Sequence, residues 1–253
     1  MRPKCDVVRS KSAGGFAARA LLRSILASPD FEHVLEEIDI PPEKLVSPLL
    51  SFLYATDELI RWRAVRAVGL VVSRMAQNSA ESARNIMRRL MWSLNDESGG
   101  IGWGAPEAMG EIMAVDEGLA REYYCILLSY IDECGNPLEN DLLERGVLWG
   151  IGRLAQARPE LVRGSVELII DQLSSADPVK RGLAVWGLGF LDFPAPNPCE
   201  TRKHLGPLLE PLLKDEAELH IYSDGELKPR RIADLAAEVL ATIGADRFSH
   251  TGQ

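Results

Sequence analysis

LERGVLWGIGRL, residues 143–154, is one of four related stretches in this chain. The other three are IRWRAVRAVGLV (60–71), IGWGAPEAMGEI (101–112) and KRGLAVWGLGFL (180–191). Aligned on Gly69, Gly110, Gly152 and Gly189, they recur at spacings of 41, 42 and 37 residues. A period near forty with helical patterning is typical of a solenoid in which each repeat is a pair of helices. The sequence therefore predicts an all-α, right-handed α-α superhelix.

Turn and capping residues divide the chain into helical pairs, as at Ala176-Asp177-Pro178, where a capping side chain precedes a helix-starting proline. We expect an N-terminal cap over residues 1–40 and repeats over 41–245, all within the single domain 1–253. The five expected hairpins pair helices at 42–54 and 58–76, 80–94 and 102–114, 117–132 and 140–156, 159–174 and 178–191, and 203–214 and 229–243.

One segment breaks the helical pattern. Residues 218–228 alternate apolar and polar side chains around Asp224-Gly225, a dipeptide favoured in two-residue β-turns that need positive φ. We predict a small β-hairpin inserted in the last helical pair. Since terminal repeats need a different outer face, we expect it to cover the apolar end of the stack.

Composition narrows the class of partner and the compartment. The formal net charge is −9, which opposes binding to nucleic acid and to the anionic face of a membrane. No run of eighteen apolar residues is present, and the N-terminal residues lack the apolar core of a secretory signal. We therefore expect a cytoplasmic protein with no membrane or nucleic-acid partner.

The repeats resemble HEAT repeats, in particular the short HEAT-like repeats of the phycobilisome-lyase type. The resemblance covers roughly residues 40–245 and rests on a glycine-centred ending of the second helix and on Asp177-Pro178-Val179-Lys180 as a helix start. The matching endings are Ala67-Val68-Gly69-Leu70-Val71, Ala108-Met109-Gly110-Glu111-Ile112, Gly150-Ile151-Gly152-Arg153-Leu154 and Gly187-Leu188-Gly189-Phe190-Leu191. The resemblance implies that the second helices line the concave side. It says little about activity, because this fold hosts many unrelated functions.

The shared register predicts which side chains lie on that concave side. Positions seven before, three before and one after the aligned glycine are spaced by four residues, so they share one helical face. Four of the five tryptophans occupy them, and we expect at least two of the four to be partly exposed. The predicted partner-binding residues are Trp62, Arg66, Trp103, Glu107, Glu111, Arg145, Trp149, Arg153 and Trp186. Trp and Arg are the residue types that dominate binding hot spots, although packing between helices is the alternative explanation.

Two features outside this pattern lead to further expectations. Trp92 lies on a first helix, where we expect it in the core. The stretch 95–107 holds Gly99, Gly100, Gly102 and Gly104, which weaken the start of a helix. It could form an adaptable loop that presents Trp103 and Glu107 to a partner, or a tight structural connection. Phosphate binding is disfavoured by the neighbouring acidic residues.

Catalytic and metal-binding patterns are weak. Cys5, Cys125, Cys134 and Cys199 lack zinc-ligand or redox spacing, so we expect reduced thiols, no metal site and no cofactor. None of the four histidines falls on the aligned concave face, which gives no support to a nucleophile and base pair. Glu107 and Glu111 could act as a carboxylate pair if burial separated their pKa values.

Three functions remain in competition. The leading hypothesis is a non-catalytic scaffold that binds a protein partner in its concave groove, such as an assembly or maturation factor. The second, implied by the resemblance, is a lyase or chaperone-like factor acting on a bound pigment or prosthetic group. The third is a DNA glycosylase of the helical-repeat type with Trp103 and Glu107 in its cleft. The acidic net charge argues against the third hypothesis.

Overall fold

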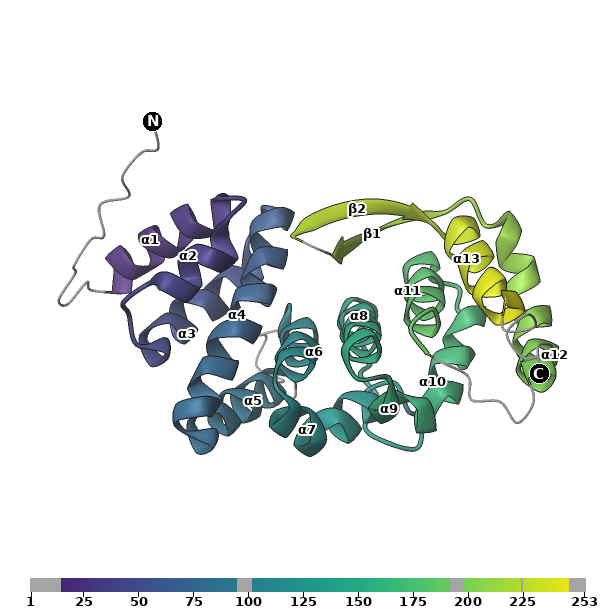
Figure 1. Cartoon of the computed structure of the whole chain (residues 1–253), viewed down its shortest axis with the longest axis horizontal. Helices are drawn as coiled ribbons and strands as arrows, with labels where there is room; N and C mark the ends of the chain where they lie inside the picture. Colours follow the sequence, from purple (N-terminus) through teal and green to yellow (C-terminus); the bar gives the residue numbers. More distant parts are fainter. Residues whose placement is uncertain (1–14, 95–101, 192–197, 224, 246–253) are drawn as a thin grey trace, which may run out of the picture.

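The computed structural model describes residues 15–94, 102–191, 198–223 and 225–245. Its helices form an arc, and a two-stranded sheet spans the open side of that arc (Figure 1). The expectations that concern residues 1–14, 95–101 and His250 lie outside the described residues. The α-helices are α1 (Gly15–Ala27), α2 (Phe31–Glu37), α3 (Pro42–Leu50), α4 (Glu58–Asn78), α5 (Ala80–Leu94), α6 (Ala105–Val115), α7 (Glu117–Ser129), α8 (Asp141–Ala157), α9 (Pro159–Val162), α10 (Val166–Asp171), α11 (Pro178–Leu188), α12 (Pro198–Leu209) and α13 (Ile232–Ala245).

The helices form two layers, which confirms the predicted α-solenoid. The second helices of successive pairs, α4, α6, α8 and α11, pack side by side along the inner side of the arc (Figure 1). Helices α5, α7 and α9 lie on the outer side (Figure 1). Among the described helices, none is long and apolar enough to cross a membrane.

Glycine allows the inner helices to approach one another closely. A Cβ atom on Gly110 of α6 would lie 2.3 Å from the Cα of Gly150 on α8. A Cβ atom on Gly152 would lie 2.5 Å from the ring of Trp186 on α11. A Cβ atom on Gly69 of α4 would lie 2.7 Å from the side chain of Glu111 on α6. A larger residue at any of these positions would push the helices apart, so three of the four aligned glycines mark close contacts between neighbouring repeats.

Most inner helices begin at a capping side chain, as the sequence predicts. Asp57, Asn140 and Asp177 accept hydrogen bonds from backbone N–H groups in the first turns of α4, α8 and α11. Helix α6 differs, because Gly104 precedes it with φ of 74° and no side-chain cap. It therefore begins at Ala105 instead of the predicted residue 102.

The outer layer is less regular than predicted. The single helix expected over 159–174 is α9, a 3₁₀ turn, α10 and a second 3₁₀ turn (Arg163–Ser165 and Gln172–Ser174). The helices expected over 42–54 and 203–214 also end in 3₁₀ turns, Ser51–Tyr54 and Glu210–Lys214. Short 3₁₀ segments at helix ends satisfy backbone groups while the chain turns toward the next unit.

The expectation that Trp92 belongs to the core is wrong. Its side chain is 78% exposed. The buried residues of α5 are Ala83, Met87 and Leu90, which follow the spacing of three and four residues that defines one helical face. Residue 92 lies off that face.

The β-hairpin is confirmed within the last helical pair, but the prediction that it covers the end of the stack is wrong. Strands β1 (Glu218–Ser223) and β2 (Glu226–Arg231) pair antiparallel from Glu218↔Arg231 to Ser223↔Glu226, and Gly225 in the turn has φ of 79°. The hairpin does not cover the end of the stack. It runs from α11 and α13 across the concave side to α4 (Figure 1). The physical reason is that side chains of β1 contact the inner helices, since Leu219 packs against Gly182 of α11 and Tyr222 stacks on Trp62 of α4.

Candidate functional site on the concave side

Aromatic rings from distant repeats meet on the concave side. Trp149 of α8 lies with its ring centroid 4.6 Å from that of Trp62 on α4 and 6.2 Å from that of Trp186 on α11. Trp186 in turn makes an edge contact with Phe190 at 5.2 Å. Tyr222 of the hairpin stacks on Trp62 at 5.8 Å with an interplanar angle of 5°. We call these five residues the aromatic row. Each such pair adds about 0.5–1.5 kcal/mol beyond the area it buries.

The aromatic row is packed instead of exposed. Trp62, Trp149 and Trp186 are 8%, 2% and 8% exposed, because they cover one another and the hairpin covers them. The expectation that at least two of the four aligned tryptophans are partly exposed is therefore wrong, since only Trp103 is partly exposed. Trp103 also lies in the turn before α6, so it does not share a helical face with the other three.

A second group of side chains forms a charge network across four helices. Glu111 of α6 is buried, and its carboxylate accepts hydrogen bonds from Arg66 of α4 at 2.6 Å and from Arg153 of α8 at 2.8 Å. Arg66 also donates to Glu32 of α2 at 2.9 Å. Both oxygens of the buried carboxylate thus have partners, which offsets the cost of removing its charge from water. The charge network consists of Glu32, Arg66, Glu111 and Arg153.

A pocket of about 240 Å³ lies where the hairpin turn meets the charge network. Its lining combines the four charged side chains with Trp149, Gln156, Tyr222, Ser223 and Gly225. We call it the hairpin-tip pocket. The pocket is lined by residues from α2, α4, α6, α8 and the hairpin. It therefore exists only when the hairpin lies across the arc.

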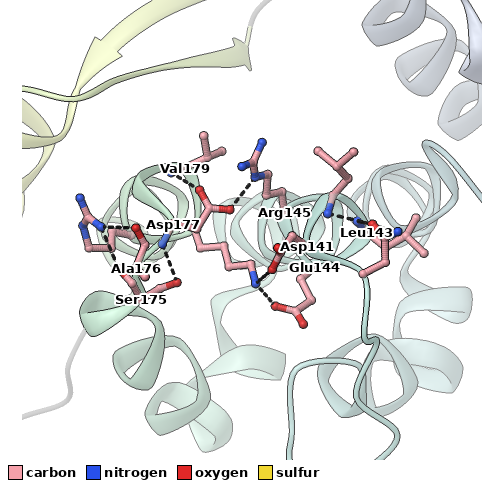
Figure 2. Close-up of polar contacts among 12 residues, drawn as sticks. Asp141, Leu143, Glu144, Arg145, Ser175, Ala176, Asp177 and Val179 are labelled. Atoms are coloured by element: carbon pink, nitrogen blue, oxygen red, sulfur yellow. Dashed lines mark hydrogen bonds and ion pairs between the residues drawn. The ribbon is translucent and has the colours of Figure 1, made fainter.

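Arg145 takes part in a separate set of ion pairs between α8 and α11. Its Nε atom donates to Asp177 at 2.6 Å, and Asp177 also caps α11 through the N–H of Val179 (Figure 2). Lys180 is held by Asp141 at 2.7 Å and by Glu144. The guanidinium group of Arg145 stays partly exposed and points toward the side of the hairpin (Figure 2).

Glu107 is the titratable group with the most unusual environment. Burial raises its pKa to about 7, and its Oε2 atom is buried with no hydrogen-bond partner among the described residues. The carboxyl group lies against Gly146 of α8, where a Cβ atom would be 2.5 Å from Oε2. The prediction of a Glu107 and Glu111 pair does not describe their surroundings, since Glu111 has two arginine partners and Glu107 faces α8 backbone.

The structure thus separates the predicted site residues into groups. Trp62, Trp149 and Trp186 belong to the aromatic row, and Arg66, Glu111 and Arg153 belong to the charge network. Trp103, Glu107 and Arg145 lie apart from both. Sequence reasoning missed Tyr222, Glu32, Gln156 and Ser223, because nothing in the repeat register shows that α2 and the hairpin reach the concave side. Among the described His, Cys, Asp and Glu side chains, no group of three could hold a metal ion.

The comparisons with known proteins agree with this architecture. Residues 142–191 match the HEAT-like repeat family. The chain is 27% identical to an uncharacterized protein of Archaeoglobus fulgidus over 198 aligned residues. The alignment covers 76% of this chain and 94% of that protein. Neither finding concerns the phycobilisome-lyase type.

Several solved structures with a similar fold are engineered or designed proteins. An engineered protein of the Northeast Structural Genomics Consortium superposes with a TM-score of 0.54 at 15% identity over 94% of each chain. A designed armadillo repeat protein superposes with a TM-score of 0.51 at 16% identity, over 90% of this chain and 92% of that one. Another designed armadillo repeat protein, solved in complex with the peptide (KR)4, superposes with a TM-score of 0.50 at 19% identity, over 89% of this chain and 92% of that one. This chain therefore has the helical-repeat fold of these proteins, and its residues 142–191 match the HEAT-like repeat family.

Proposed function

We propose that this protein is a non-catalytic scaffold that binds a protein segment on its concave side, as an assembly or maturation factor would. The observation that carries the proposal is a set of partly exposed guanidinium groups, Arg66, Arg145 and Arg153, on the second helices that line the concave side. Arginine offers directed hydrogen bonds, and its fixed position lowers the entropy lost on binding. A designed armadillo protein of similar fold was solved with a peptide, which supports a protein partner.

The predicted binding residues take two different roles in this proposal. The buried tryptophans Trp62, Trp149 and Trp186 pack the inner helices together and make few direct contacts with a partner. The arginines and Trp103 make the contacts with the partner. Glu111 holds Arg66 and Arg153 in place, and Glu107 lies against α8 beneath this surface. Since the network anchors Arg66 and Arg153, Arg145 is the best single residue for a test of binding.

The test compares two arginine variants as baits in affinity capture from native extract. Arg145→Ala removes a guanidinium group from the concave side. Arg121→Ala removes one from α7 on the outer side, where Arg121 pairs with Glu117 at 2.8 Å. We expect the Arg145 variant to bind its captured partner about tenfold more weakly, and the Arg121 variant to bind like wild type. Equal binding by all three proteins would contradict a concave binding surface.

The alternative of a lyase or chaperone-like factor predicts a different result. A protein that acts on a bound pigment or prosthetic group should change the absorbance spectrum of that group on mixing. The scaffold hypothesis predicts an unchanged spectrum together with capture of a protein partner.

A further inference from the structure

The hairpin-tip pocket contains guanidinium N–H donors that have no hydrogen-bond partner among the described residues. Each guanidinium group carries five N–H groups. Arg66 uses two of them, toward Glu32 and Glu111. Arg153 uses three, two toward Glu111 and one toward Gln156. Half of the guanidinium N–H groups in the pocket therefore have no partner among the described residues.

Two deeply buried side chains of the pocket lining add unpartnered donors. The indole Nε1 atom of Trp149 and the hydroxyl of Tyr222 are buried and have no hydrogen-bond partner in the described part of the chain. Trp149 is 2% exposed and Tyr222 is 5% exposed. Buried polar atoms in proteins nearly always have a partner, so a ligand that accepts hydrogen bonds would satisfy atoms that the protein leaves unsatisfied.

The two carboxylates of the pocket differ in how firmly they are held. Glu111 is 2% exposed and bonded through both oxygens, so it acts as a fixed counter-ion that orients both arginines. Glu32 is 37% exposed and has one bond, to Arg66. A single, partly exposed ion pair of this kind contributes about 1 kcal/mol or less to stability. A ligand could displace Glu32 while Arg66 and Arg153 stay in position.

We propose that the hairpin-tip pocket binds the carboxylate group of a ligand, with Arg66 and Arg153 as the charged donors and Trp149 and Tyr222 as the buried ones. A carboxylate accepts two parallel hydrogen bonds from a guanidinium group. A single negative charge suits this pocket better than a phosphate, because two glutamates already balance the two arginines. The ligand is either a free carboxylic acid or the C-terminal carboxylate of a peptide. The proposal goes beyond the scaffold function, because a free acid would need no protein partner.

Nuclear magnetic resonance of the indole N–H groups tests the proposal on the purified full chain. The Trp149 signal is assigned by its loss in Trp149→Phe. Benzoate is the charged probe, and benzamide is its neutral counterpart of the same shape. We expect benzoate to shift the Trp149 signal with a Kd on the order of 1 mM, and benzamide to leave it in place. Equal shifts from both probes, or none from either, would overturn the proposal.

Charge variants give a result that a purely structural role would not produce. Glu32→Gln removes the competing carboxylate at an exposed site, so benzoate should bind several times more tightly. Arg153→Gln should weaken binding at least tenfold, and Arg121→Gln on the outer side should change nothing. Unchanged or weaker binding by the Glu32 variant would count against the proposal even if the Arg153 variant failed to fold.

A pair of short acetylated peptides distinguishes the two sources of the carboxylate. If the C-terminal acid of a glycyl-glycine peptide shifts Trp149 and its C-terminal amide does not, the pocket recognises a peptide end. If benzoate shifts the signal and the peptide acid does not, the pocket recognises free acids. Both outcomes support a carboxylate site, and neither depends on Arg145, which tests the scaffold function separately.

Discussion

The inner helices α4, α6, α8 and α11, which we call the wall, and the hairpin that crosses them are packed through different kinds of contact. In the wall, neighbouring helices touch through glycine backbones, as at Gly110 and Gly150, and each contact joins adjacent repeats. The hairpin joins distant repeats through large side chains, with Tyr222 stacked on Trp62 of α4. Contacts in solenoids ordinarily link only adjacent repeats. The comparison shows that this protein adds a long-range closure through aromatic side chains to local contacts between helix backbones.

The largest effect is expected from filling a wall contact. Gly110→Ala would place a methyl group 2.3 Å from the Gly150 backbone, so α6 and α8 must move apart. We expect the free energy of unfolding to fall by about 3 kcal/mol or more, measured by urea denaturation. Gly206→Ala in α12 is the control, because a Cβ atom there meets nothing within 4 Å. Because alanine has the higher helix propensity, the control should keep or gain stability, and a control that lost as much stability would contradict the close contact as the cause.

The wall also contains a pH-dependent element. The folded pKa of Glu107 is about 7 and its ordinary value is 4.5, so between these pH values the folded state holds a proton that the unfolded chain has released. Stability should therefore fall as pH rises through this window. The free energy of unfolding of Glu107→Gln should equal that of wild type near pH 4. At pH 8 it should exceed the wild-type value by on the order of 3 kcal/mol, measured by denaturation at each pH.

The control for this prediction is Glu117→Gln on α7. Arg121 lowers the pKa of Glu117 by a side-chain hydrogen bond, which is the opposite shift. This variant should gain no stability at high pH. A similar gain in both variants would mean that net charge, and not the burial of Glu107, sets the pH dependence.

The hairpin closure can be broken at a single ring. Tyr222→Ala removes the side chain that stacks on Trp62, and we expect the free energy of unfolding to fall by about 2 kcal/mol. Unfolding should also become less cooperative, since the ends of the arc are no longer joined. Tyr222→Phe keeps the ring and removes a hydroxyl that has no partner in the described residues, so it should stay within about 0.5 kcal/mol of wild type. Calorimetry of the two variants checks both expectations.

The smallest effect on stability is expected at Arg145. Its ion pair with Asp177 is partly exposed, so Arg145→Ala should cost about 0.5 kcal/mol. A thermal shift assay measures this cost. If the variant instead unfolds as readily as Gly110→Ala, the residue belongs to the structural wall and is unsuitable as a probe of binding.

The repeat register predicts the wall well, because the physical cause of the pattern is local. A glycine at each closest approach recurs with the helical pair, so Gly69, Gly110 and Gly152 align from the order of residues alone. The same register puts Trp62, Trp149 and Trp186 in equivalent positions, and they do form one row. It cannot show that they are buried, because their cover comes from outside the repeats.

Other parts of the site depend on contacts that no local pattern specifies. Tyr222 follows the alternation of a strand, but the alternation does not say which surface the strand will meet. The register puts Trp103 on a helix that begins only at Ala105, since Gly104 adopts a left-handed conformation. Residue type alone favours the core for Trp92, whereas its position on α5 faces away from the buried side.

The closure has a consequence for the order of events during synthesis. Tyr222 follows Trp62 by 160 residues, which at about 5–20 residues per second corresponds to roughly 8–30 seconds on the ribosome. Throughout that interval the growing chain carries inner helices whose indole rings lack their final cover. The nascent repeats therefore present a transient apolar surface to chaperones, and translation of the last strands ends that exposure.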